Sequence, residues 1–266
     1  MVSVLIPCRN ESRFIRHVLE DVVAQDYPCD LLEVFVLDGM SSDDTPAIIQ
    51  SVSASHPFIQ YIPNEARIVP PALNKGIRMS KGDIIVRLDA HASYPAHYIS
   101  GLVRNLQTLH ADNVGGVGIT QPASDTLTGR VIAAILSHPF GVGNSLFRTG
   151  VTSATEADTV PFGCFRRDVF DRFGMFDERL IRNQDIEFNK RIKAGGGKIF
   201  LVPDVHSVYY ARSTFPALIK NNFQNGRWIL LTAHYTGTFS SLSVRHFIPL
   251  FFTLYLLLLP VAHALT

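Results

Sequence analysis

The sequence predicts an α/β fold, with a mostly parallel sheet flanked by helices. Two observations predict this class. Short apolar runs of strand length alternate with longer stretches that repeat apolar residues at helical spacing, which is typical of βαβ units. Polar clusters also follow several of the apolar runs directly. Because ligands on such sheets bind beyond the carboxyl ends of the strands, we expect a functional site at these clusters.

The first 120 residues contain most of the expected elements. Their strands are compact apolar runs at residues 2–7, 32–37, 58–62, 84–88 and 114–120. Helices are expected at residues 11–25, from 45, at 71–80 and at 95–110, because apolar residues recur there at helical spacing or the segment begins with residues that favour a helix start. Thr45 is a good capping residue, for example, and Pro46 suits the first helical position.

A second unit is expected over residues 121–212. It contains predicted helices at 126–138, 168–173 and 185–194 and a predicted strand at 199–202. A mobile loop rich in glycine, serine and threonine is expected after the first of these helices. The run Gly195–Gly197 is expected to end the last helix, because glycine tolerates the left-handed conformation found there.

The C-terminal part is predicted to contact a membrane. Residues 213–245 mix bulky apolar residues with Lys220 and Arg227, which suits an amphipathic helix in the membrane interface. Residues 246–266 are expected to form a transmembrane helix, since 20 uncharged helical residues span roughly 30 Å, the thickness of the bilayer hydrocarbon. A buried core helix is the alternative. The basic residues Arg245 and His246 predict an inner, cytoplasmic membrane location with the preceding domain facing the cytoplasm.

Charge and cysteine content exclude several classes of protein. The net charge of +1 over 266 residues gives no basic stripe, so nucleic acid is not an expected partner. The three cysteines form no C-x-x-C pair, so neither a zinc knuckle nor a disulfide framework is predicted. No secretory signal peptide is expected, because the chain begins directly with a strand. A nicotinamide dehydrogenase is disfavoured, because no G-x-G-x-x-G follows the first strand.

Two clusters after strands suggest specific chemistry. Asp38 could accept hydrogen bonds from a base or a ribose, although Asp is equally common as a turn residue. Asp89 and His91 could place a carboxylate and an imidazole on one divalent ion, and the imidazole favours Mn²⁺ over Mg²⁺. Such an ion would neutralise a departing diphosphate.

Four segments in this order resemble the nucleotide-binding half of a family 2 glycosyltransferase with the GT-A fold: VSVLIPCRNE, VFVLDGMSSDDT, ALNKGI and GDIIVRLDAH. The chain is similar over essentially its whole length to bacterial exopolysaccharide glycosyltransferases of the succinoglycan-biosynthesis ExoA type. The resemblance implies a Rossmann-like nucleotide-sugar-binding half at residues 1–120 and an acceptor-binding, catalytic half at residues 121–212. It suggests UDP-glucose as the donor, a saccharide or lipid-linked oligosaccharide as the acceptor, and Mn²⁺ or Mg²⁺ as the cofactor.

The resemblance also implies roles for individual donor-side positions. Asp89 would take the first place of the D-x-D metal motif, and His91, which replaces its last Asp, would be a second metal ligand or would only line the site. The nucleotide would be held by residues from three of the segments, with Asp38 on the uracil: Pro7, Arg9, Glu11, Asp38, Lys75 and Gly76.

Three matches lie on the acceptor side. The segment 161–167 is similar to an acceptor-side motif and implies a contact from Gly163. Asp185 aligns with the general base, although Gln184 replaces the Glu that the family usually has before it; a plain helix-capping carboxylate is the alternative. Residues 224–228 match the Q-x-x-R-W pattern of membrane-bound family 2 synthases, which implies diphosphate contacts from Gln224 and Arg227 and stacking of Trp228 on a sugar. An interfacial anchor is the alternative for Trp228.

Together these features predict an inverting hexosyltransferase in exopolysaccharide or cell-surface polysaccharide synthesis. Two alternatives remain open at this point. A polyprenyl-phosphate sugar transferase would use a lipid phosphate as the acceptor. A non-catalytic nucleotide-sugar-binding protein would account for the departure at Gln184.

Overall fold

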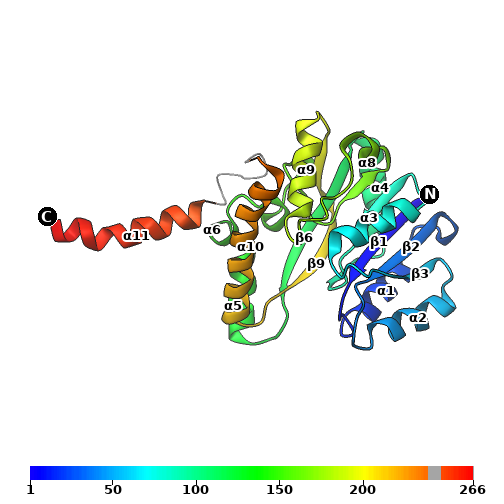
Figure 1. The fold of residues 1–266 in the computed structure, drawn as a ribbon. Coiled ribbons are helices and arrows are strands. Elements are labelled where there is room, and N and C mark those ends of the chain that lie inside the picture. Colours follow the sequence, from blue (N-terminus) through cyan, green and yellow to red (C-terminus); the bar gives the residue numbers. More distant parts are fainter. Residues whose placement is uncertain (239–246, 266) are drawn as a thin grey trace.

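The computed structural model describes residues 1–238 and 247–265 (Figure 1). In its first half, the strands are β1 (Val2–Cys8), β2 (Leu32–Asp38), β3 (Ile59–Pro63), β4 (Ile84–Arg87) and β5 (Ala92–Ser93). The helices of this half are α1 (Ile15–Val23), the 3₁₀ turn η1 (Cys29–Leu31), α2 (Thr45–Ser55), α3 (Val69–Met79) and α4 (Tyr98–Thr108). All four expected helices and the first four expected strands are confirmed, with small shifts at their ends.

The second half holds the remaining strands β6 (Asn113–Pro122), β7 (Thr155–Glu156), β8 (Cys164–Arg166) and β9 (Ile199–Ala211). Its helices are α5 (Leu127–Ser137), α6 (Pro139–Val142), α7 (Leu146–Thr149), α8 (Asp168–Phe173) and α9 (Gln184–Ala194). The loop expected after α5 therefore contains two short helices. Pro139 suits the first turn of α6, and Gly143 and Gly150 end α6 and α7 with φ of +61° and +86°.

The described strands form one mixed sheet in the order β3-β2-β1-β4-β8-β6-β9-β5, with β7 paired to β9. The long ladders among β1, β2, β3 and β4, and between β6 and β9, are parallel, as predicted. The antiparallel pairs are short and involve β5, β7 and β8. The carboxyl ends of the four parallel strands of the first half therefore meet at one edge of the sheet.

Both faces of the sheet are covered by helices, which explains why its strands are continuous apolar runs. On one face, Val4 and Ile6 pack with residues of α1 and α4. On the other face, Leu5 packs with residues of α3 and α9. Gly76 lets α3 approach the sheet closely, because a Cβ there would lie 2.7 Å from Leu5 Cδ2.

Strand β9 runs well beyond the expected residues 199–202. Its ladder with β6 is interrupted at Gly116 and Val117, where the register jumps from Val202 to His206. This bulge carries Pro203, which cannot donate to the ladder and so marks a break in the sequence pattern. After the bulge the strand continues to Ala211, and this second part reaches the functional site.

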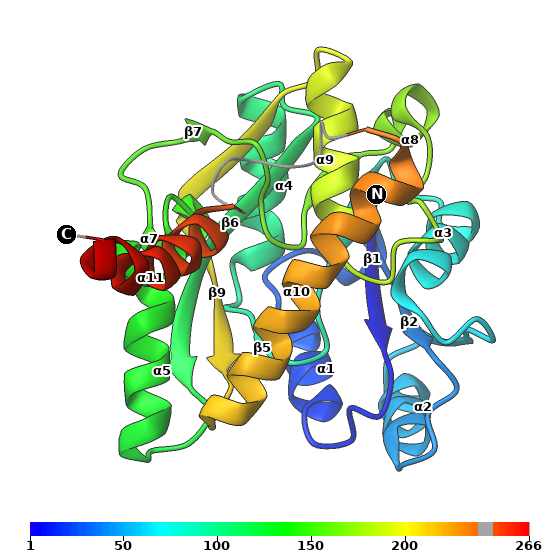
Figure 2. The same cartoon turned by 60° about the vertical axis from the view of Figure 1, so that its left-hand side comes forward.

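The C-terminal region forms α10 (Phe215–Thr236) and α11 (Ile248–Leu265). Figure 1 shows α11 projecting away from the rest of the molecule, and Figure 2 shows α10 running across the front of the sheet region. The helix expected within 213–245 is confirmed as far as Thr236, while residues 239–246 lie outside the described part. The expected transmembrane helix is not supported: among residues 1–238 and 247–265, no helix combines the length and apolar character needed to cross a bilayer.

Candidate active site

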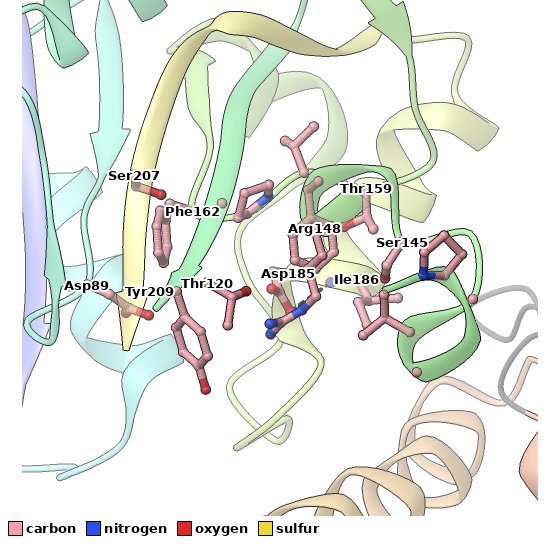
Figure 3. A pocket seen from close by; sticks show the side chains of 18 of the residues that line it. Asp89, Thr120, Ser145, Arg148, Thr159, Phe162, Asp185, Ile186, Ser207 and Tyr209 are labelled. Atoms are coloured by element: carbon pink, nitrogen blue, oxygen red, sulfur yellow. Dashed lines mark hydrogen bonds between the residues drawn. The ribbon is translucent and has the colours of Figure 1, made fainter. Parts of the chain in front are cut away.

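Two adjoining hollows lie beyond the carboxyl ends of the parallel strands. The smaller has a volume of about 190 Å³ and is lined by loops that follow β1, β2, β3 and β4. The larger has a volume of about 680 Å³ and lies among β6, β9, α6, α7 and the start of α9. Figure 3 shows the side chains around this second space. Asp89 lines both hollows.

The smaller hollow brings together five of the residues that the sequence predicted for the donor and metal sites: Pro7, Arg9, Glu11, Asp89 and His91. The end of β1 supplies three of them, because the chain leaves the sheet there in a turn in which Asn10 has a φ of +56°. The backbone N–H groups of this turn donate to the hydroxyls of Ser41, in the loop after β2, and Thr45, at the start of α2. Two neighbouring loops therefore build one wall.

Three other predicted donor residues do not line either hollow. Asp38 is fully buried, and its carboxylate accepts hydrogen bonds from the Ser41 backbone and from the Tyr61 hydroxyl at 3.1 Å each. Lys75 Nζ donates to the Pro63 carbonyl at 2.6 Å, and Gly76 packs against the sheet. In this structure they shape the loops behind the hollow, and their contacts with a nucleotide stay predictions.

Asp89 is held at the centre of a buried polar group. Its carboxylate lies 3.3 Å from Nη2 of Arg87, and its backbone N–H donates to the Tyr94 hydroxyl at 2.7 Å. Burial lowers the pKa of Arg87, but Asp89 and then Asp185 outweigh it and raise the pKa overall. Arg87 is thus the positive charge that both carboxylates share.

His91 faces Glu11 across the smaller hollow. Its Nδ1 lies 3.6 Å from Glu11 Oε1. The nearby Glu11 carboxylate raises the pKa of His91 above its ordinary value, while burial opposes this effect. The carboxylate of Asp89 raises the pKa further, which indicates that the two predicted metal-binding groups lie close enough to interact.

The residues present fit a divalent ion that is completed by a substrate. Within the described residues, no group of three or more His, Cys, Asp or Glu side chains could hold a metal by itself. Asp89 and His91 nevertheless line the same hollow. Mg²⁺ and related ions commonly bind through one or two protein ligands plus phosphate oxygens, so a two-residue set suits an ion that arrives with a diphosphate.

Asp185 enters the larger hollow from the first turn of α9. The chain turns into this helix through Asn183, whose φ of +63° is a conformation that Asn tolerates better than most residues. Asp185 Oδ1 accepts a hydrogen bond from the Ile186 backbone at 2.9 Å. Its neighbour Glu187 is buried and pairs with Arg191 at 2.6 Å, so Glu187 holds α9 in place and does not line the hollow.

The remaining predicted acceptor residues lie elsewhere. Gly163 sits beside the larger hollow with a φ of +101°, and its carbonyl accepts a bond from the Arg87 backbone at 3.0 Å. Gln224, Arg227 and Trp228 are on α10 and line neither hollow. The Trp228 ring lies 6.5 Å from the Tyr235 ring on the same helix. Their contacts with phosphate or sugar also stay predictions.

Among the polar residues that line the larger hollow and that sequence reasoning missed are Arg87, Thr120, Arg148 and Tyr209. Arg87 had a recognisable signal, because it is a charged residue inside an apolar strand two positions before Asp89. The other three residues had no such signal in the sequence. Thr120 and Tyr209 depend on the register of β6 and β9, and Arg148 depends on the folding of a loop that was expected to be mobile.

Comparisons with known proteins agree on one family. The model of the family described as "Glycosyl transferase family 2" matches residues 3–174. A Methanococcus voltae protein named dolichyl N-acetyl-alpha-D-glucosaminyl phosphate 3-beta-D-2,3-diacetamido-2,3-dideoxy-beta-D-glucuronosyltransferase is 30% identical over 233 residues, which cover 85% of this chain and 71% of that protein. Succinoglycan biosynthesis protein ExoA of Rhizobium meliloti is 28% identical over 226 residues, which cover 84% of this chain and 67% of that protein.

Solved structures support the same fold. S. aureus TarS, residues 1–349, in complex with UDP-GlcNAc superposes with a TM-score of 0.62 at 16% sequence identity. The match covers 80% of this chain but only 59% of the TarS chain, less than two thirds of its length. At this identity the likeness shows the fold, which is the GT-A-like arrangement of a mostly parallel sheet flanked by helices.

Proposed function

The chain belongs to glycosyl transferase family 2, a family whose relatives act in polysaccharide and glycoconjugate biosynthesis, and from this premise we propose that it transfers a hexose from a UDP-sugar to a lipid-linked saccharide with inversion of the anomeric carbon. Glucose is the hexose that the sequence resemblance favours. One observation carries this proposal: Asp89 lines both the smaller hollow, where the predicted donor residues Pro7, Arg9 and Glu11 gather, and the larger hollow, which Asp185 also lines.

The smaller hollow is the proposed donor site. Its lining combines carboxylate and guanidinium groups from Glu11 and Arg9 with flat apolar surface from Pro7 and Val69. Such a mixture suits a base and a ribose, which need both stacking and hydrogen bonding. TarS, which shares the fold, binds UDP-GlcNAc in its solved complex.

Asp89 and His91 would hold the divalent ion between this site and the larger hollow. When bound, the ion supplies positive charge for the diphosphate that leaves. Arg87 keeps the Asp89 carboxylate in place at 3.3 Å before the ion and the donor arrive. Tyr94 fixes the backbone at the same position through its bond to the Asp89 N–H.

Asp185 is the proposed general base. Its carboxylate takes the proton from the acceptor hydroxyl as the hydroxyl oxygen forms a bond to the anomeric carbon. The bond between that carbon and the nucleoside diphosphate breaks on the opposite side, so the configuration inverts. The start of α9 favours a negative charge at Asp185, and Arg87 interacts with both carboxylates that frame the reaction.

The acceptor and the location are further parts of the proposal. The name of the M. voltae relative gives it a dolichyl phosphate-linked sugar as substrate, which supports a lipid-linked acceptor here. A lipid-linked acceptor requires contact with a membrane, and we place the protein at the cytoplasmic face of the inner membrane. Helix α10 supports this, because Phe215, Ile219, Phe223 and Leu230 are exposed along one side of it.

Calorimetric titration of UDP with and without Mn²⁺ tests the donor site. We expect wild-type protein to bind UDP with Mn²⁺ present, and Asp89→Ala to lose the Mn²⁺-dependent part of the affinity. Asp125→Ala is a matched control, since Asp125 is an exposed carboxylate that lines neither hollow. Failure of UDP to bind wild type with Mn²⁺ present, or tighter binding of GDP under the same conditions, would refute the uridine assignment.

A further inference from the structure

We propose that Arg148 determines acceptor specificity by binding an anionic group of the acceptor in the larger hollow. The inference deepens the proposed function, because it takes the larger hollow as the acceptor site. The chemistry that Arg148 would recognise is a phosphate or carboxylate group placed near the reactive hydroxyl. Two sources could supply it: the phosphate that links a sugar to its lipid carrier, or the carboxylate of an acidic sugar.

The fold brings Arg148 into the hollow through close packing of a short helix. α7 packs directly on β6 at Gly118, where an added Cβ would lie 3.5 Å from the Phe147 carbonyl oxygen. Gly150 then ends α7. The side chain of Arg148 is thereby directed toward β9, and Figure 3 shows it beside Tyr209, Thr120 and Asp185 around the same space.

Two aromatic rings hold the guanidinium in place. The Arg148 Cζ atom lies 4.9 Å from the centre of the Tyr209 ring and 5.4 Å from the centre of the Phe147 ring. Contacts with ring faces stabilise a guanidinium while leaving its N–H groups at the edge available. Those N–H groups have the geometry that binds a carboxylate or a phosphate through two parallel hydrogen bonds.

The positive charge of Arg148 is not paired with a carboxylate in the part of the protein that the structure describes. No ion pair or hydrogen bond of its side chain is formed with residues 1–238 or 247–265, although Asp89 and Asp185 line the same hollow. The other arginine there, Arg87, is buried and already pairs with Asp89. Arg148 is therefore the arginine of this hollow that is open to an incoming anion.

The position of Arg148 favours the acceptor over the donor. Of the two hollows it lines only the larger, whereas the proposed donor site is the smaller hollow, which shares Asp89 with the larger one. Exposed apolar residues line the same hollow as Arg148: Phe140 is 99% exposed and Ile248 is 55% exposed. A cation and exposed apolar side chains in one hollow suit an amphiphile whose charged group binds Arg148 and whose apolar part contacts these side chains.

Calorimetry on the intact chain, saturated with UDP and Mn²⁺, tests the proposal with two probes. Farnesyl diphosphate represents the lipid-linked source, and methyl β-D-glucuronide represents the acidic sugar. We expect wild type to bind one of them, and Arg148→Ala and Arg148→Gln to bind it at least about tenfold more weakly, with Arg148→Lys between them. Arg130→Ala is the matched control, because Arg130 is an exposed arginine on the neighbouring α5 that lines neither hollow.

The probe whose binding is lost identifies the source of the anion. The proposal is overturned if neither probe binds wild type, or if both Arg148→Ala and Arg148→Gln bind like wild type. It is also overturned if these variants weaken UDP binding to the same extent, since Arg148 would then belong to the donor site. If UDP fails to bind wild type, the donor assignment falls, and the probe titrations repeated without UDP still decide the role of Arg148. Thermal melts of every variant exclude loss of the fold.

Discussion

Among single residues, Asp185 is the one whose loss should separate binding from chemistry. Asp185→Asn keeps the size of the side chain and removes its basicity. We expect turnover to fall by about 10²–10⁴-fold, because general-base catalysis typically contributes that much, while UDP affinity stays unchanged. UDP release from UDP-glucose measures turnover, with extracted bacterial membrane lipids as the acceptor pool.

The exposed Asp171, which lines neither hollow, provides the control variant Asp171→Asn. Undiminished turnover in Asp185→Asn would remove Asp185 as the base. It would also favour the polyprenyl-phosphate alternative, because a phosphate acceptor is already ionised and needs little help from a base.

Asp43 should make the stability of the folded protein depend measurably on pH in the acid range. The side-chain hydrogen bonds of Thr45 and Ser12 lower the pKa of Asp43 to about 2, from an ordinary value of 3.8. A lowered pKa in the folded state stabilises the fold above the ordinary pKa, and the stabilisation is lost as the pH falls toward the folded value. We therefore expect Asp43→Asn to lower Tm at neutral pH, and the difference from wild type to shrink between about pH 4 and pH 2. A difference that grows in acid would contradict this assignment.

The sequence could predict residues whose position follows from a strand end alone. Arg9, Asp89 and His91 meet because parallel strands end at one edge, and their order in the chain is enough to place them there. The buried state of Asp38 could not be predicted, because it depends on the Tyr61 hydroxyl, 23 residues away. The contact of Lys75 could not be predicted either, since the carbonyl that accepts its hydrogen bond belongs to β3.

Among the secondary-structure elements, the bulged pairing of β6 with β9 should be sensitive to added volume. A Cβ at Gly116 would lie 2.5 Å from the Val205 carbonyl oxygen. Since a backbone atom cannot move aside cheaply, we expect Gly116→Ala to destabilise the protein by about 1–3 kcal/mol. Thermal melting should show this as a Tm lower by roughly 2–12 °C.

Gly226→Ala is the matched control. Gly226 lies inside α10, and a Cβ there meets nothing within 4 Å. Because Ala is favoured over Gly in a helix by about 1 kcal/mol, Tm should stay the same or rise. Equal melting of wild type and Gly116→Ala would mean that the bulge can relax.

Elements buried on both faces were the easiest to predict. The strands β1, β2 and β4 are mainly apolar runs because helices cover both sides of the sheet, and α1 to α4 follow from the spacing of the residues they bury. The second part of β9 was missed because the bulge breaks the pattern at Pro203. The short helices α6 and α7 were missed because four residues are too few to show helical spacing, and because exposed side chains such as Phe140 carry no burial pattern.

For the whole molecule, the exposed apolar side of α10 should control attachment to membranes. Ile219 and Phe223 are 65% and 70% exposed, and Lys220 and Arg227 flank their side of the helix. Burial of such a side chain in lipid is worth about 1.5–3 kcal/mol. The double variant Ile219→Ser with Phe223→Ser should therefore float with phosphatidylglycerol-containing vesicles at least about tenfold more weakly. Binding by wild type should also weaken with added salt, because basic residues contribute through a screened attraction.

Leu31→Ser is the control for this measurement. Leu31 is 45% exposed on η1, in the first half of the chain. Its loss removes a comparable apolar group without changing α10. Equal flotation of the double variant and wild type would exclude α10 as the attachment surface.

The position of Asp89 in the wall between two hollows has a thermodynamic consequence. Arg87 pairs with Asp89 and interacts with Asp185. A ligand that binds Asp89 from one hollow therefore changes the electrostatic environment of the other hollow. Two ligands that share such a wall have linked equilibria, and linkage is reciprocal. Whatever factor a bound nucleotide imposes on the acceptor's dissociation constant, the acceptor must impose on the nucleotide's. The sign and size of that cooperativity can therefore be obtained from titrations of the nucleotide alone, at rising concentrations of acceptor, with no turnover at all.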